Sequence, residues 1–412
     1  MAPKTPKMPP PLLSPLQQDA VSELSAALKR GDLSCLYPEE AKKQTKGEKR
    51  RAREESVADA LLEETGDLFE RNRLSRNRVI TTAAVRDGLF REDLEASLSA
   101  IFRNKIVAKP YVSKKNKVTE RALNLLLSDL HFGSNLDPKE VPLRFGPNEE
   151  ARRLAAVVVQ AAEYKPQYRD ETILNVHLAG DIIEGELHDP RNVKPLAEQC
   201  AAAIHYLVQA LTFLSTRFKA VHVYSTPGNH DRNTARHRER AISQKWDSIG
   251  NIIYFAVKTA TAQLPNIVFD IDQRPYYLFD SFGRKGMVTH GDTVANVGYP
   301  GKSISIDTVT KIVNAHNGPV EAHDRIGLLA IGHVHIGSCV RLPNRAVFIS
   351  NGALVPPGPH ALSMNAFDSA CGQMLWESVP GHMVGDHRFL VVDEYTDTDS
   401  DLEKVISPFR GF

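Results

Sequence analysis

Five short motifs rich in aspartate, histidine and asparagine occur in order along this sequence. They are Asp129-Leu-His131, Gly180-Asp181, Gly228-Asn229-His230-Asp231, His290 in the segment VTHG, and Gly332-His333-Val-His335. Each falls at the end of a predicted buried strand. One such motif alone is usually a turn or a satisfied polar residue, but the ordered set indicates a metal site.

The donor atoms in these motifs narrow the choice of metal. Imidazole, carboxylate and amide ligands together suit manganese, iron, zinc or nickel better than calcium or magnesium, which prefer oxygen ligands. We therefore expect a divalent ion, with Mn²⁺ first and Fe, Zn or Ni as alternatives.

The pattern D-x-H, G-D, G-N-H-[DE], H and G-H-x-H resembles that of the calcineurin-like metallophosphoesterase superfamily over roughly residues 122–395. The resemblance implies two divalent ions whose ligand sets share one aspartate. A shared carboxylate holds two cations about 3.5–4 Å apart, so that they share one water, lower its pKa toward neutrality and make it a hydroxide nucleophile. One set is Asp129, His131, Asp181 and His335, and the other is Asp181, Asn229, His290 and His333. It also implies that His230 lies outside both sets as the general acid, with the adjacent Asp231 helping to keep its imidazole charged.

The residues around the motifs bear on the substrate. Protein phosphatases of the superfamily carry an Asp-Arg pair after the bridging aspartate, whereas this chain reads GDIIEGE, which disfavours that activity. Double-strand-break repair nucleases usually have a histidine three residues beyond that aspartate, where this chain has Glu184. The segments RFGPNEEARRLAAVV, GNHDR followed by Trp246-Asp247, and GHVH followed by SNGALV resemble bacteriophage-encoded, DNA-repair-exonuclease-like phosphoesterases.

The function predicted from these features is two-metal hydrolysis of phosphodiester bonds, with nucleic acid as the substrate and partner. Two alternatives belong to other classes. The first is a small-molecule enzyme, such as a cyclic-nucleotide phosphodiesterase or a nucleotide phosphatase, which fits the same motifs. The second is a binding scaffold with an idle site, which the complete ligand set disfavours.

The elements that must position the motifs are those of an α/β domain. LNLLLSD (123–129), TILNVHLAG (172–180) and VHVYSTPG (221–228) predict buried strands, and apolar residues from Leu196 to Leu214 recur at the spacing of one long helix. Farther along, IVFDID, YYLFD, GMVTHG, GLLAIGH, AVFISNG and FLVVDE predict closely spaced strands with fewer helices. We therefore expect an αββα sandwich, in which a second sheet faces the first and helices lie outside.

The N-terminal third differs in composition from the rest. We predict a proline-rich, largely disordered tail at 1–40, a basic helical unit at 41–115, the phosphoesterase domain at 122–395 and a C-terminal tail at 396–412. The basic unit resembles a helix-turn-helix over about 54–105 and is a candidate nucleic-acid grip, with a docking arm as the alternative. Its basic run comprises Lys42, Lys43, Lys46, Lys49, Arg50, Arg51 and Arg53.

Global composition sets few further limits. The chain has 412 residues, a net charge of +1 and 42% hydrophobic residues, which is ordinary for a globular protein of one large and one small domain. Its four cysteines are scattered, which favours a reducing compartment, and no apolar run is long enough to span a bilayer. We expect a cytoplasmic protein without a membrane partner, in the host cytoplasm if it is phage-encoded; the oligomeric state is left open.

Overall fold

The structure is a computed structural model that describes most of the chain beyond residue 120. It describes residues 99, 108–111, 121–137, 139, 141, 144–164, 172–187, 193–233, 245, 247–272, 274–293, 304–359, 370–393 and 399–411. The chain divides into two compact units, Met1–Asp93 and Leu94–Phe412. All elements described below belong to the second unit.

The first sheet has six strands in the order β11-β10-β1-β2-β3-β4. Strands β1 to β4 run parallel, while β10 is antiparallel to β1 and β11 is antiparallel to β10. Every residue of β1 is buried, as expected for a central strand covered on both faces. The bounds are β1 Ala122–Leu127, β2 Ile173–Leu178, β3 Ala220–Ser225, β4 Ile267–Ile271, β10 Gly372–Ser378 and β11 His387–Val391.

The second sheet has five strands in the order β5-β6-β7-β9-β8. Strands β6, β7 and β9 run parallel, and the edge strands β5 and β8 are antiparallel to their neighbours. The bounds are β5 Tyr276–Ser281, β6 Arg284–Thr289, β7 Ile326–Ile331, β8 Ser338–Arg341 and β9 Val347–Ser350. Both sheets are therefore mixed.

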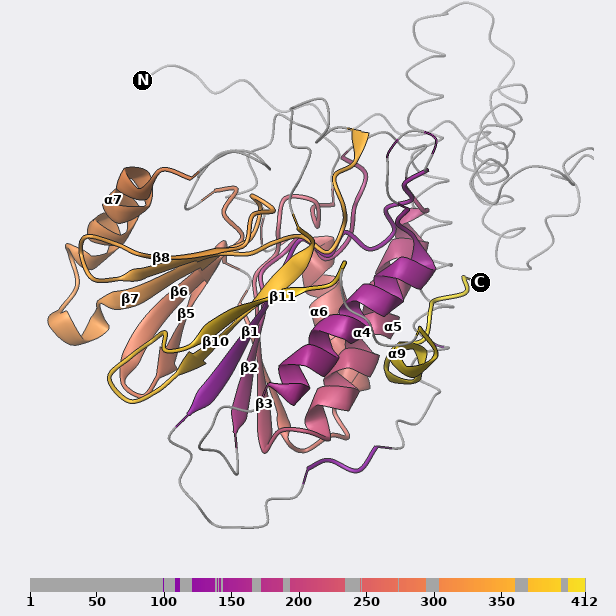
Figure 1. Ribbon diagram of the computed structural model, residues 1–412, viewed down its shortest axis with the longest axis horizontal. Coiled ribbons are helices and arrows are strands. Elements are labelled where there is room, and N and C mark those ends of the chain that lie inside the picture. Colours follow the sequence, from indigo (N-terminus) through magenta and orange to yellow (C-terminus); the bar gives the residue numbers. More distant parts are fainter. Residues whose placement is uncertain are drawn as a thin grey trace, which may run out of the picture. The chain divides into compact units, whose positions relative to one another are not determined.

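The two sheets face each other across an apolar core, and helices cover their outer faces (Figure 1). Side chains such as Leu126 and Trp376 from the first sheet meet Phe279, Val288 and Leu328 from the second. Helices α4, α5 and α6 lie on the first sheet, and α7 packs on the second through Val309 and Val313. The helices are α4 Pro147–Glu163, α5 Leu196–Ser215, α6 Ile249–Ala260, α7 Ile306–Asn317, the 3₁₀ turn η5 Ala322–Asp324 and α9 Asp399–Val405.

The predicted αββα sandwich is confirmed, as are the predicted strands and the long helix α5. The C-terminal strand candidates do not all form the second sheet. IVFDID forms β4, which pairs with β3, and FLVVDE forms β11 at the other edge of the first sheet. Local sequence shows that a segment is a strand but not which neighbour it pairs with, since pairing depends on contacts distant in sequence.

The structure describes most of the C-terminal end of the chain but little of its N-terminal third. The predicted C-terminal tail contains α9, which packs against α4 and α5. The predicted N-terminal tail and almost all of the basic unit lie outside the described residues. Among the helices that are described, none combines the length and apolarity needed to cross a membrane.

Candidate active site

The predicted ligand residues all follow strands whose carboxyl ends meet at one end of the sandwich. Parallel strands place their carboxyl ends at the same edge of a sheet, where α/β folds gather functional side chains. In the first sheet these strands are β1, β2 and β3, and in the second they are β6 and β7. The structure therefore brings together residues that are more than 200 positions apart in the sequence.

The first group of side chains consists of Asp129, His131 and His335, whose donor atoms lie within 4.8 Å of one another. His131 Nε2 lies 3.3 Å from His335 Nε2, and His335 Nε2 lies 3.3 Å from Asp129 Oδ1. Asp129 and His131 are buried, whereas His335 is partly exposed. This arrangement leaves the group accessible on one side.

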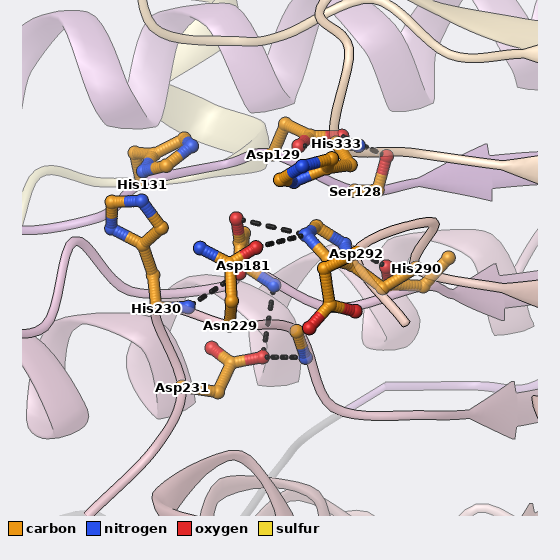
Figure 2. A network of polar contacts seen from close by, with 12 residues as sticks. Ser128, Asp129, His131, Asp181, Asn229, His230, Asp231, His290, Asp292 and His333 are labelled. Carbon is orange, nitrogen blue, oxygen red and sulfur yellow. Dashed lines mark hydrogen bonds and ion pairs between the residues drawn. The ribbon is translucent and has the colours of Figure 1, made fainter. Parts of the chain in front are cut away.

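The second group consists of Asp181, His290 and His333, again within 4.8 Å, with Asn229 beside them. His290 Nε2 lies 3.0 Å from Asp181 Oδ2 and 3.0 Å from Asn229 Oδ1. Figure 2 shows Asp181 between His131 and His230 on one side and His290 on the other. That position suits the bridging role, which itself stays a prediction.

These separations fit donors that surround a cation. Ligand atoms about 2.1 Å from one ion lie about 3.0 Å apart at octahedral angles and about 3.4 Å apart at tetrahedral angles. The four distances above, 3.0 to 3.3 Å, fall in that range. Both groups mix imidazole nitrogen with carboxylate or amide oxygen, which suits a transition metal.

The outer contacts of the histidines direct Nε2 into the site. His290 Nδ1 donates to the backbone oxygen of Ala179 at 2.8 Å, and His131 Nδ1 donates to Glu184 Oε2 at 2.8 Å. A carbonyl or carboxylate oxygen can only accept, so each imidazole keeps a proton on Nδ1, and Nε2 is the nitrogen that offers a lone pair when the ring is neutral. The histidines are thus prepared to coordinate through Nε2.

The backbone at the site is held in an unusual conformation. Asp129, His131, Asp181, His333 and His335 have φ between 50° and 70°, the left-handed region. Among the described non-glycine residues, only Phe282 and Arg345 share this feature. Aspartate and histidine tolerate that region better than most residues, but each position still costs on the order of 1 kcal/mol or more. Such strain concentrates at functional sites.

Two glycines allow the loops to approach the aspartates closely. A Cβ on Gly228 would lie 2.1 Å from Asp181 Oδ1, and a Cβ on Gly332 would lie 2.5 Å from Asp129 Oδ2. Neither contact could be relieved without moving a predicted ligand. The glycines of GNHD and GHVH are therefore required by packing at the site.

His230 lies beside the first group, and its ring meets that of His131 edge-on at 4.6 Å between centroids. Its Nδ1 donates to the backbone oxygen of Glu184 at 2.7 Å. The role of Asp231 in keeping the His230 imidazole charged stays a prediction. The Asp231 carboxylate accepts hydrogen bonds from the backbone N–H groups of Asp181, Ile182 and Gly228 at 2.8 to 2.9 Å. It therefore connects the GNHD loop to the segment that carries Asp181.

Burial and carboxylates act in opposite directions on the site histidines. Burial tends to lower the pKa of His131, but the negative charges of Glu184, Asp181 and Asp129 outweigh it and raise the pKa to about 9. Burial is likewise outweighed at His290, where Asp181 is the main cause of a pKa raised to about 10. At His333, burial and the charge of His290 lower the pKa to about 4. In the metal-free protein the site therefore attracts positive charge.

Sequence reasoning missed several residues that support the ligands. Glu184 contacts His131 and His230. The only feature of the sequence that pointed to it was its position three residues after Asp181. Ser128 Oγ donates to Asp129 Oδ2 at 2.5 Å and accepts from Asn351 at 2.9 Å. Asn351 belongs to the SNGALV segment, which contributes to the resemblance described above, but the sequence did not indicate what its side chain contacts.

A buried ion pair also joins two of the loops. Lys245 Nζ donates to Asp292 Oδ1 at 3.1 Å and to the backbone oxygen of Pro227 at 2.7 Å. Asp292 follows His290 by two residues and lies near it in Figure 2. Nothing in the sequence around Lys245 indicated this contact.

The predicted nucleic-acid contacts, Lys42, Lys43, Lys46, Lys49, Arg50, Arg51 and Arg53, lie outside the described residues. Their role therefore stays a prediction.

Comparison with known proteins finds likenesses among solved structures, including the three described below. No protein-family model matches the sequence, and no curated protein matches it significantly. A dimetal phosphatase from Danio rerio is 12% identical, with 66% of this chain and 99% of that chain covered and a TM-score of 0.33. A metallophosphoesterase from Sphaerobacter thermophilus is 13% identical, with 69% of this chain and 92% of that chain covered and a TM-score of 0.25. A calcineurin-like phosphoesterase from Bacillus subtilis is 11% identical, with 69% of this chain and 95% of that chain covered and a TM-score of 0.30.

Proposed function

We propose that this protein is a two-metal-dependent phosphoesterase that hydrolyses phosphodiester bonds. The observation that carries the proposal is the meeting of seven side chains, from five strand ends, in two groups with the donor spacing of ligands around a cation. A purely structural cluster would pair each donor hydrogen with an acceptor. Here His335 Nε2 lies 3.3 Å from both His131 Nε2 and Asp129 Oδ1, so donor atoms from three side chains converge on one position.

In this proposal Asp129, His131 and His335 hold one divalent ion, and Asn229, His290 and His333 hold the other. Asp181 joins both sets. Two ions bound there, Mn²⁺ in our proposal, would polarise the phosphoryl oxygens and lower the pKa of a water between them. The protein supplies the fixed orientation of the ligands, which costs no reorganisation during the reaction.

His230 is proposed as the general acid. Its Nδ1 is committed to the Glu184 carbonyl oxygen, so the proton that reaches the leaving oxygen comes from Nε2. The ring lies against His131, next to the first group of ligands. Asp231 contributes by holding the GNHD loop to the segment that carries Asp181.

We further propose that the substrate is a nucleic acid and that the protein works in the cytoplasm. The support is the resemblance of the motif surroundings to phage-encoded nuclease-like enzymes, together with the basic run at 42–53. The scattered cysteines support a reducing compartment.

One assay tests the reaction and separates the substrate classes. Metal-free protein is given Mn²⁺, Fe²⁺, Zn²⁺ or Ni²⁺ and offered bis-p-nitrophenyl phosphate, p-nitrophenyl phosphate, cyclic AMP, and single- and double-stranded DNA. We expect Mn²⁺-dependent cleavage of the diester and of DNA. Turnover of cyclic AMP or the monoester alone would favour the small-molecule alternative, and no turnover with any metal would favour the idle scaffold.

The nucleic-acid grip has a separate test. Replacing Lys49, Arg50, Arg51 and Arg53 by glutamine removes four positive charges and none of the proposed ligands. For single-stranded DNA, log affinity depends on log salt with a slope of about −0.7 per neutralised phosphate, so the slope should flatten by roughly two to three. An unchanged slope would assign the basic unit to docking or oligomerisation instead.

A further inference from the structure

Glu184 connects the two histidines that flank the first ligand group. It lies on the segment after β2 and is 8% exposed. Its Oε2 accepts a hydrogen bond from His131 Nδ1 at 2.8 Å, and its backbone oxygen accepts one from His230 Nδ1 at 2.7 Å. Its own N–H donates to the backbone oxygen of Phe132 at 3.1 Å. The residue is therefore fixed at both its side chain and its main chain.

These contacts decide where each imidazole carries its proton. An ionised carboxylate and a carbonyl are acceptors only, so both histidines must keep a hydrogen on Nδ1. In neutral His131 the lone pair then lies on Nε2, which faces His335 Nε2 at 3.3 Å and the Asp129 carboxylate. In His230 the proton that is exchanged must be the one on Nε2.

We propose that Glu184 is a positioning residue for both histidines, acting on His131 through its carboxylate and on His230 through its main-chain carbonyl. The inference rests on the proposed metal-dependent function and specifies how one residue orients a ligand and an acid together. A carboxylate behind a coordinating histidine holds the ring and strengthens nitrogen as a donor.

The side-chain role can be tested by metal binding without turnover. Metal-free wild type, Glu184→Gln and Glu184→Ala are titrated with Mn²⁺ by calorimetry. We expect one of two binding steps to weaken by about 10–100-fold in Glu184→Ala, the usual effect of losing such a partner, and by less in Glu184→Gln, which keeps an acceptor oxygen. The matched control is Glu377→Ala, because Glu377 is also buried but pairs with Arg121 at the other end of β1.

Kinetics at saturating Mn²⁺ test the division of roles. Both Glu184 variants keep the carbonyl that contacts His230, so turnover should depend on the leaving group as steeply as it does in wild type. A steeper dependence, like that expected for His230→Ala, would mean that the side chain governs His230 and would overturn the division.

The Mn²⁺ titrations of wild type and the Glu184 variants decide the inference. Wild-type Mn²⁺ affinity at both steps in Glu184→Ala would overturn it while leaving the proposed function intact. Binding of three ions by wild type and two by the variant would make Glu184 a ligand, since His131, Glu184 and His230 also lie close enough to hold a cation. Should Glu184→Ala fail to fold, the isosteric Glu184→Gln decides. If wild type bound no Mn²⁺ at all, the proposed function itself would fail.

Discussion

Two buried histidines in this sandwich have opposite surroundings, His131 at the strand ends and His177 on β2 between the sheets. His131 is surrounded by carboxylates, which outweigh burial and raise its pKa to about 9. His177 stacks on Tyr224, Tyr277 and Trp376 at 5.4 to 6.0 Å between centroids, and burial alone lowers its pKa to about 3. The same residue type is thus charged in one region and neutral in the other.

The surroundings of His177 and His131 differ in how their hydrogen-bonding groups are satisfied. Around His177, Asn124 and Tyr277 supply one acceptor and one donor, and Asn175 continues the chain of hydrogen bonds, so the core network closes on itself. At the strand ends the outer nitrogens are satisfied, but Nε2 atoms and carboxylates point at common positions. A closed network indicates a structural role, whereas convergent donors indicate a ligand site.

The strongest test of this comparison is Asp181→Asn. Asparagine keeps the size of the side chain but removes the charge that both ligand groups share, so we expect loss of metal and of measurable Mn²⁺-dependent turnover. Metal content by mass spectrometry and diester hydrolysis provide the measurement. The control is Asp280→Asn. Asp280 lies near the end of β5 that is farther from the ligand residues, where it accepts a hydrogen bond from the backbone N–H of Gly283 at 3.0 Å. Full activity in the Asp181 variant would contradict the site.

The next largest effect is expected for His230→Ala. A lost general acid usually costs about 10²–10⁴-fold, and the loss should be greatest for substrates with poor leaving groups. Activated nitrophenyl esters should suffer less, and metal content should not change. His323→Ala is a matched control, since His323 is exposed on η5. Loss of metal in the His230 variant would instead show that His230 is a ligand.

The outcome for His230 illustrates what the sequence could and could not predict. Each ligand position was identifiable because its motif follows a strand, and parallel strands bring their ends together. The prediction for Asp231 rested on its adjacency to His230, but neighbouring residues at a strand end point in different directions, so adjacency does not show which groups a side chain contacts. Asp231 faces the Asp181 loop, and the partner of His230 comes from the segment after β2.

Strand pairing was the other part that sequence could not supply. Strand β10 is buried along its whole length and lies beside β1, with Leu123 opposite Glu377, about 250 residues away. Its sequence, GQMLWES, mixes polar and apolar residues and does not indicate which sheet it joins. Its place is decided by which neighbours bury it, and that information is spread over the whole chain.

The pKa contrast also predicts a pH dependence for the strand-end site. In the metal-free protein, carboxylates favour the protonated forms of His131 and His290. That stabilisation is complete below pH 6.5 and is lost as the pH rises through about 9 and about 10. Metal binding requires neutral imidazole, so Mn²⁺ should displace protons and bind about tenfold more tightly per pH unit for each proton released. Calorimetry in buffers of different ionisation enthalpy measures that release, and none at pH 7.5 would contradict the pKa values.

The smallest expected effect concerns His177→Phe, which keeps an aromatic ring in the stack but leaves the Tyr277 hydroxyl and the Asn124 carbonyl with one partner fewer. At pH 7 this should cost about 1–3 kcal/mol of stability.

The folded pKa of His177, about 3, lies below the unfolded value of 6.5, so wild type loses stability as the pH falls below 6.5. At pH 5 that loss is about 2 kcal/mol, or 1.5 pH units at about 1.4 kcal/mol each. The phenylalanine variant has no such loss, so its deficit relative to wild type should shrink by about 2 kcal/mol between pH 7 and pH 5. Urea unfolding at the two pH values measures the deficit; a constant value would mean that His177 accepts a proton in the folded core, and the contrast with His131 would then fail.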